Sequence, residues 1–173
     1  MTERVYIGLG SNVGDRYRHL SDAVRELAAL DGTTVTAVSS IYETDPVGVE
    51  DQRKFYNAAV CISSVLDATS LYHQLKLIEQ KIGRRATYRY GPREIDLDLL
   101  LYGNEQIHNE WITVPHKEVQ TRRFVLAPLA ELAADVLHPV FHKTIGTLLE
   151  ECSDPHAVHK QQLPFTTVLQ DLS

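Results

Sequence analysis

Two aspartates interrupt the apolar stretch IDLDLLLYG at residues 95–103. Because successive side chains of a strand point to opposite faces, Asp96 and Asp98 are expected on one face, with Leu97, Leu99 and Leu101 on the other. The two aspartate Cα atoms would then lie roughly 6.5 Å apart. Carboxylates in this arrangement could bind magnesium, an ion that usually keeps coordination positions for substrate phosphates. The alternative is a strand face that is simply solvated.

Four arginines stand directly before the aspartates, in the segment GRRATYRYGPR at residues 83–93. They are Arg84, Arg85, Arg89 and Arg93. Guanidinium groups bind phosphate oxygens through paired hydrogen bonds, so arginines beside a metal site favour a polyphosphate ligand. The sequence lacks the motif G-x-x-x-x-G-K-S/T, which argues against a P-loop kinase. A solvated basic loop, or a nucleic-acid-binding loop with interleaved tyrosines, is the alternative interpretation.

The segment KFYNAAV at residues 54–60 could bind a flat heterocycle. Phe55 and Asn57 share a strand face by the same alternation of side chains. An aromatic ring can stack on a heterocycle, and a nearby amide supplies both a donor and an acceptor for its polar edge. The alternative is that Phe55 belongs to the core and that Asn57 caps a turn.

The elements that must position these residues follow from the apolar periodicity. Strands are predicted at residues 5–10, 33–44, 55–66 and 94–103. One helix is predicted over residues 16–30 with Asp15 as its N-cap, and a second from Asp67 or Ser70 to a stop at Gly83. This order predicts an α+β fold with a ferredoxin-like βαββαβ core.

Two further features complete the predicted fold. Additional C-terminal helices are predicted at residues 123–135 and 144–152. Residues 45–54 and 84–93 lack periodicity, and loops of this length are often functional, so we expect two long active-site loops.

The composition limits the class of protein. The chain has 173 residues, 43% of them hydrophobic and 23% charged, which is typical of one soluble domain. Its net charge of −6 argues against broad charge-driven binding to nucleic acid or to an anionic membrane. The sequence has no signal-peptide pattern, no long apolar run and only two cysteines, so we expect a cytoplasmic protein.

Several motifs in a fixed order resemble a known family, the 6-hydroxymethyl-7,8-dihydropterin pyrophosphokinases of folate biosynthesis. They are IGLGSNVGD, SSIYETDPVG, FYNAAV, IEQKIGR, YGPREIDLDLLLYG and VPHKEVQTRRFVLAPLAELA. The pattern G-P-R-x-I-D-L-D-L-L-L-Y-G is highly specific to this family. The resemblance implies a single pyrophosphokinase domain over residues 1–173, of which the tail at 153–173 matches poorly.

The resemblance also assigns roles to individual residues. It implies that Asp96 and Asp98 bind two Mg²⁺ ions, and that Arg93 and the loop residues Arg84 or Arg85, and Arg89, act on the phosphates. For the pterin it implies Thr44, Val47, Phe55, Asn57 and Phe124. For ATP it implies Glu79, Arg93, Thr113, His116 and Arg122.

Four departures from the family pattern concern the loops and the nucleotide. The loop between Gly83 and Gly91 is one residue shorter than in the familiar form. Tyr90 stands where a tryptophan is familiar, and Asp45 where a proline is. Trp111 stands in place of an arginine near the nucleotide, which implies that this contact is missing or replaced.

The resemblance implies an unusual phosphoryl transfer with ATP as co-substrate. The pterin hydroxymethyl oxygen attacks the β-phosphorus of ATP, and AMP leaves. No residue stands out as a general base, so positioning and charge stabilisation are expected to dominate. We expect a monomer that binds these two small molecules, and neither nucleic acid nor membrane. The rival hypotheses are a metal-dependent nuclease or nucleotidyl transferase, and a non-catalytic ferredoxin-like module that binds nucleotide and regulates a partner.

Overall fold

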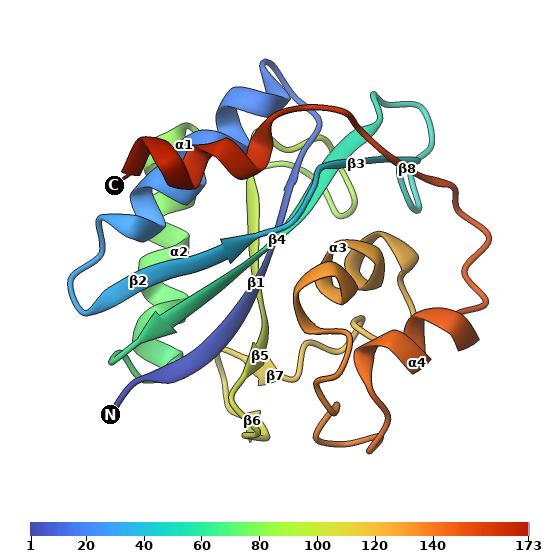
Figure 1. The fold of residues 1–173 in the computed structure, drawn as a ribbon. Helices are drawn as coiled ribbons and strands as arrows, with labels where there is room; N and C mark the ends of the chain where they lie inside the picture. Colours follow the sequence, from blue (N-terminus) through green and yellow to red (C-terminus); the bar gives the residue numbers. More distant parts are fainter. Residues whose placement is uncertain (173) are drawn as a thin grey trace.

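An antiparallel sheet forms the centre of the protein (Figure 1). The structure is a computed structural model that describes residues 1–172, apart from the side chains of residues 166 and 167. The strands of this sheet are β1 (Glu3–Ser11), β2 (Thr33–Val38), β3 (Tyr42–Thr44), β4 (Phe55–Ser64), β5 (Asp96–Tyr102) and β8 (Val158–Lys160). They lie in the order β5-β1-β4-β3-β8, and β2 pairs with β4 beside β3.

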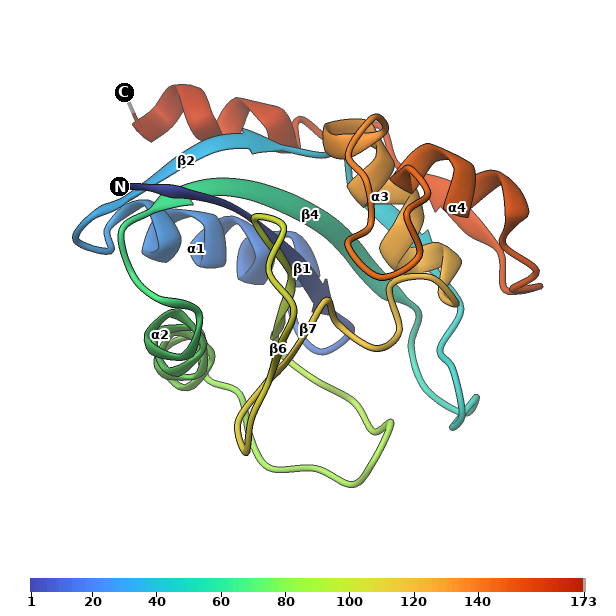
Figure 2. The ribbon, with the colours of Figure 1, turned by 90° about the horizontal axis from the view of Figure 1, so that it is seen from below.

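Helices cover both faces of the sheet. They are α1 (Arg16–Ala28), α2 (Ala68–Ile82), α3 (Arg123–Ala133), α4 (Ile145–Glu151) and the 3₁₀ helix η1 (Phe165–Leu172). Figure 2 shows α1 and α2 on one side of the sheet and α3 and α4 on the other. Each side has its own apolar core, and β1, β4 and β5 contribute side chains to both. A short ribbon of β6 (Ile107–His108) and β7 (Thr113–Val114) lies beside β5.

Local signals fix the ends of the first two helices. Asp15 caps α1 by accepting a hydrogen bond from the backbone N–H of Arg18, as predicted. Asp67, rather than Ser70, caps α2, and its carboxylate accepts from the Ser70 backbone N–H. Gly83 ends α2 with a φ of 114°, a left-handed conformation that favours glycine.

The predicted strand at residues 33–44 is wrong as a single element. It divides into β2 and β3, which both pair with β4 but are separated by three residues. The hydroxyl of Ser39 accepts a hydrogen bond from the Ala59 backbone N–H at 2.8 Å, so a side chain takes the place of a backbone acceptor here. Strand β3 pairs with the first residues of β4, Phe55–Asn57, so it lies at the end of the sheet that the loop of residues 45–54 joins.

The alternation predicted for β5 is correct for its first residues and wrong for Leu101. The register between β1 and β5 shifts after Tyr6, so that Leu99 pairs with Ile7 and Leu101 with Tyr6. Leu100 is the extra residue of this bulge. Leu97 and Leu99 therefore pack under α1 and α2, whereas Leu101 packs with the α3 and α4 side.

The C-terminal segment adds structure that the sequence pattern did not predict. Strand β8 extends the sheet beyond β3, and η1 packs against α1 and β2. The helices predicted at residues 123–135 and 144–152 correspond to α3 and α4 with slightly shorter bounds. Within the described residues, none of the helices combines the length and apolarity needed to cross a membrane.

Candidate active site

A cavity of about 360 Å³ lies where β1, β3, β4 and β5 meet the first residues of α3. Its walls include most of the residues that the sequence suggested for the site. They are Thr44, Val47, Phe55, Asn57, Arg84, Arg89, Arg93, Asp96, Asp98, His116, Arg122 and Phe124. Residues that are far apart in the sequence thus surround one space.

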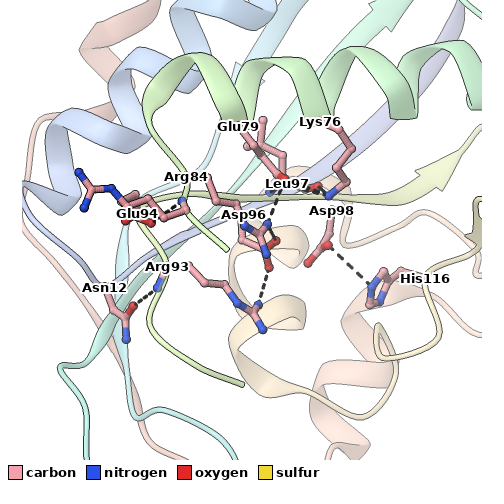
Figure 3. Close-up of polar contacts among 11 residues, drawn as sticks. Asn12, Lys76, Glu79, Arg84, Arg93, Glu94, Asp96, Leu97, Asp98 and His116 are labelled. Carbon is pink, nitrogen blue, oxygen red and sulfur yellow. Dashed lines mark hydrogen bonds and ion pairs between the residues drawn. The ribbon is translucent and has the colours of Figure 1, made fainter. Parts of the chain in front are cut away.

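Asp96 lies between two arginines (Figure 3). Arg84 Nη1 donates to Asp96 Oδ1 at 2.8 Å, and Arg93 Nη1 donates to Asp96 Oδ2 at 2.9 Å. Burial alone would raise the pKa of Asp96, but the charges of Arg93, Arg84 and Lys76 outweigh it and hold that pKa below its usual range. The carboxylate is therefore ionised, and it fixes two guanidinium groups at the cavity wall.

Glu79 stands behind Asp96 and stabilises the free edge of β5. Its carboxylate accepts from the Leu97 backbone N–H at 2.8 Å, from Arg84 Nη1 at 3.0 Å and from Lys76 Nζ at 3.0 Å. Its side chain is only 4% exposed. Glu79 thus positions Arg84 and lines neither cavity described here, although the sequence suggested contact with ATP.

Asp98 differs from Asp96 in having no close partner. Among the described residues its carboxylate accepts no hydrogen bond, and His116 Nε2 lies 4.0 Å from its Oδ1 (Figure 3). Burial, and next the charge of Asp96, raise the pKa of Asp98 to about 8. Burial also lowers the pKa of His116. Asp98 thus stands at this end of the site without the hydrogen-bonded arginines that Asp96 has.

The other end of the cavity suits a flat polar ring. Asn57 is buried, and its Nδ2 donates to Thr44 Oγ1 at 2.7 Å, which fixes the orientation of the amide. A Cβ on Gly10 would lie 2.8 Å from Asn57 Oδ1, so any other residue at position 10 would clash with that oxygen. Half-buried Phe55 and Phe124 line the same cavity.

A second cavity of about 380 Å³ lies between α2, β5 and the β6–β7 ribbon. Asp98, His116 and Lys117 line both cavities, so the two spaces meet at these residues. Thr113, which the sequence suggested for ATP, lines only the second cavity. Lys76 also lines it, and Lys76 Nζ lies 3.4 Å from the carbonyl oxygen of Leu97.

Asn12 anchors both long loops at the end of β1. Its Nδ2 donates to Gln52 Oε1 at 2.8 Å and to the Arg53 carbonyl at 2.9 Å. Its Oδ1 accepts from the Arg93 backbone N–H at 2.8 Å. The loops at residues 45–54 and 84–93 also touch directly, because a Cβ on Gly48 would lie 2.9 Å from the Tyr90 ring.

The structure separates the two candidate loop arginines. Arg84 lines the first cavity, whereas Arg85 is exposed and outside both cavities. Arg89 lies on the loop with its guanidinium 4.9 Å from the ring centre of Tyr90.

Three residues of the site were not predicted from the sequence: Asn12, Lys76 and Lys117. Lys76 could have been found, because it stands three residues before Glu79 on α2, and both side chains face the edge of β5.

The fold and the site define a mixed α/β protein in which arginines and a carboxylate pair stand where two cavities meet. Such an arrangement suits the positioning of a polyphosphate against a second small molecule. A model of the family "7,8-dihydro-6-hydroxymethylpterin-pyrophosphokinase (HPPK)" matches residues 6–134. The chain belongs to this family and is a pyrophosphokinase.

Individual relatives agree with the family model. The chain is 49% identical over 136 residues to the 2-amino-4-hydroxy-6-hydroxymethyldihydropteridine pyrophosphokinase of Bacillus subtilis, covering 79% of this chain and 81% of that protein. It is 39% identical over 163 residues to the folic acid synthesis protein fol1 of Pneumocystis carinii, covering 94% of this chain and 22% of that protein.

Solved structures share the fold at low sequence identity. Wild-type HPPK-DHPS of Plasmodium falciparum with SDX-DHP superposes with a TM-score of 0.68 at 16% identity, covering 87% of this chain and 43% of that chain. The chain therefore spans less than half the length of that protein. At this identity the likeness concerns the fold alone.

Proposed function

We propose that the protein transfers the terminal diphosphate of ATP to the hydroxymethyl group of 6-hydroxymethyl-7,8-dihydropterin and releases AMP, a step of folate biosynthesis. The observation that carries this proposal is the meeting of two cavities at Asp98 and His116. One cavity offers a buried amide and two aromatic rings, and the other extends along the lysines and the ribbon. Two different small molecules can thus bring their reacting ends together at one point.

The first cavity suits the pterin ring. The Asn57 amide would hydrogen-bond the polar edge of the heterocycle, while Phe55 and Phe124 would contact its faces. Thr44 orients the amide, and Val47 closes the wall from the first loop. A ring bound in this way would direct its hydroxymethyl group towards Asp96 and Asp98. The oxygen would then approach the β-phosphorus in line with the leaving AMP.

The arginines would stabilise the charge that develops during the transfer. Arg84 and Arg93 are fixed by Asp96 at the cavity wall, so little reorganisation is needed when phosphates arrive. Arg89 lies on the loop and would add its charge when that loop closes. Arg122 and His116 would contact the nucleotide phosphates from the α3 side. Closure of both loops would exclude water and limit idle hydrolysis of ATP.

Magnesium fits the chemistry of Asp96 and Asp98. Each Asp96 oxygen uses one lone pair for Arg84 or Arg93 and keeps a second for a cation. The Asp98 carboxyl accepts no hydrogen bond from a described residue, and a cation would stabilise its charged form. In residues 1–172 no cluster of three or more His, Cys, Asp or Glu could hold a metal ion, so the assignment of two ions rests on these two aspartates. Bound Mg²⁺ would screen the negative charge of the triphosphate.

The same proposal includes a ferredoxin-like topology for the core. A ferredoxin-like core is supported by the order of the elements and by the central position of β1 and β4 in the antiparallel sheet. We further propose that residues 1–173 act as a single monomeric domain in the cytoplasm, with no nucleic acid or membrane as partner. The net charge of −6 supports the absence of nucleic acid and anionic membranes among its partners.

AMP formation tests the proposal. The assay contains ATP with and without the hydroxymethyl pterin, over a series of magnesium concentrations, for the wild type and for Asp98→Asn. We expect AMP only when the pterin is present, and a rate at least about 10²-fold lower in the variant. Asp22→Asn, on the solvent-exposed face of α1, is the matched control and should keep full activity.

Each rival hypothesis predicts a different outcome. A regulatory module would bind ATP without forming AMP. A nuclease or nucleotidyl transferase would act on nucleic acid and ignore the pterin. Full activity in Asp98→Asn would remove the metal-ligand assignment while leaving the reaction in place.

A further inference from the structure

Trp111 is an exposed aromatic residue at the tip of the β6–β7 ribbon. Trp111 is 52% exposed and lines the second cavity. The turn that carries it is held in shape, because Asn109 Oδ1 accepts from the backbone N–H groups of Trp111 and Ile112 at 2.8 and 3.0 Å. The Asn109 backbone N–H also donates to the Ile112 carbonyl at 3.0 Å. A large apolar side chain is thus presented to solvent on a fixed support.

Contacts with α2 restrict the indole further. The ring centres of Trp111 and His73 are 4.9 Å apart with an interplanar angle of 72°, an edge-to-face contact. Tyr72, the neighbour of His73 on α2, also lines the cavity, and Lys76 Nζ lies 5.4 Å from the centre of its ring. Asn109 Nδ2 donates to Thr69 Oγ1 at 3.2 Å, which joins the ribbon to the start of α2.

The position of this aromatic wall follows from the two cavities. Phosphates placed at Asp98 and His116 leave two directions for the rest of a nucleotide. The first cavity contains the amide and the rings that the proposed function gives to the pterin. The second is lined by Trp111 and also by the cationic side chains of Lys76 and Lys117, which suit phosphates. A nucleobase extending from those phosphates would therefore reach the indole.

We propose that Trp111 binds the nucleoside triphosphate by stacking its indole on the purine base. This inference rests on the proposed function for the position of the phosphates. Every nucleobase has a π-face, so an aromatic side chain can bind the base by stacking without any particular charge or hydrogen-bonding pattern. The base gains its affinity from ring contact, because the backbone N–H groups of Trp111 and Ile112 already donate to Asn109.

Intrinsic fluorescence gives a direct readout, because the chain has a single tryptophan. The probes are α,β-methylene-ATP, in which the bond to be broken is not cleavable, and inorganic tripolyphosphate, which has no base. Both are titrated with Mg²⁺ into the wild-type protein. We expect saturable quenching of the Trp111 emission by the nucleotide analogue and none by tripolyphosphate.

Steady-state kinetics separate a binding role from a structural one. In Trp111→Ala the KM for ATP should rise about 5- to 150-fold, the range expected for the loss of one base–aromatic contact. The kcat, the KM for the pterin and the melting temperature should stay unchanged. Trp111→Phe should recover most of the ATP affinity. Phe141→Ala, which removes an exposed ring outside both cavities, is the matched control.

The outcomes separate this inference from the function on which it rests. An unchanged KM for ATP in Trp111→Ala, an equal rise in the KM for the pterin, or equal quenching by tripolyphosphate would overturn the stacking role while AMP formation stands. Absence of AMP formation in the wild type would overturn the proposed function. The comparison of the analogue with tripolyphosphate would then decide the stacking role by itself.

Discussion

Gln52 donates a hydrogen bond from its side-chain Nε2 to the carbonyl oxygen of Tyr90 at 2.8 Å. The two residues lie in different loops, so this bond joins the segments 45–54 and 84–93 directly. The same nitrogen donates to the Val49 carbonyl at 2.7 Å, and the side-chain oxygen accepts from Asn12. One amide thus links the first loop, the second loop and the end of β1. Movement of either loop is expected to involve the other.

Gln52→Ala should uncouple the loops. The variant loses hydrogen bonds worth about 0.5–1.5 kcal/mol each, all at the surface end of the site, so the fold should survive. We expect faster amide hydrogen exchange in residues 45–54 and 84–93 and a lower kcat. Gln106→Ala, which removes a single exposed bond to the Pro139 carbonyl, serves as the control. Faster exchange in one loop only would contradict the coupling.

Arg84 and Arg85 form a natural pair for testing the loop arginines. Arg84 contacts Glu79 and Asp96. The Arg85 side chain makes no hydrogen bond or ion pair with a described residue, and only the Arg85 backbone N–H donates, to Glu94 Oε2 at 3.3 Å. Arg84→Ala should lower kcat by about 10²-fold, since a preorganised charge near the transferring group is lost. It should also lower the melting temperature, because Glu79 loses a partner. Arg85→Ala should change stability by no more than about 0.5 kcal/mol. Equal losses of activity would contradict the assignment of Arg84.

The raised pKa of Asp98 predicts how stability depends on pH without metal. The folded-state pKa of about 8 lies above the ordinary aspartate pKa of 3.8, so the folded protein binds the proton more tightly than the unfolded chain. Its stabilising contribution is complete at acidic pH and is lost as the pH rises to about 8. The melting temperature of the wild type should therefore fall relative to that of Asp98→Asn between pH 5 and 8. Parallel curves for the two proteins would show that the pKa is not raised.

Local rules explain which elements were predictable from the sequence. Asp15, Asp67 and Gly83 act on backbone groups within a few residues, so the ends of the helices follow from the sequence. The interruption at Ser39 and the bulge at Leu100 depend on hydrogen bonds to strands that are distant in the sequence. No periodicity within a single segment could have indicated them.

In the site, too, residue type and spacing were predictable from the sequence, whereas contacts between distant segments were not. Asp96, Asp98 and the loop arginines were suggested by residue type and spacing. The choice between Arg84 and Arg85 was open, because it depends on the direction in which the chain leaves Gly83. The bonds of Asn12 to both loops appear only in three dimensions, because its partners are distant in the sequence.

Transfer of a diphosphate in one step is the central claim, and the fate of the β-phosphorus tests it most directly. ATP labelled at the β-phosphorus is incubated with the hydroxymethyl pterin and Mg²⁺, and the products are separated. The account predicts that all transferred label appears in the pterin diphosphate and that unlabelled AMP forms in equal amount. Labelled ADP, with a pterin monophosphate that carries no label, would contradict it.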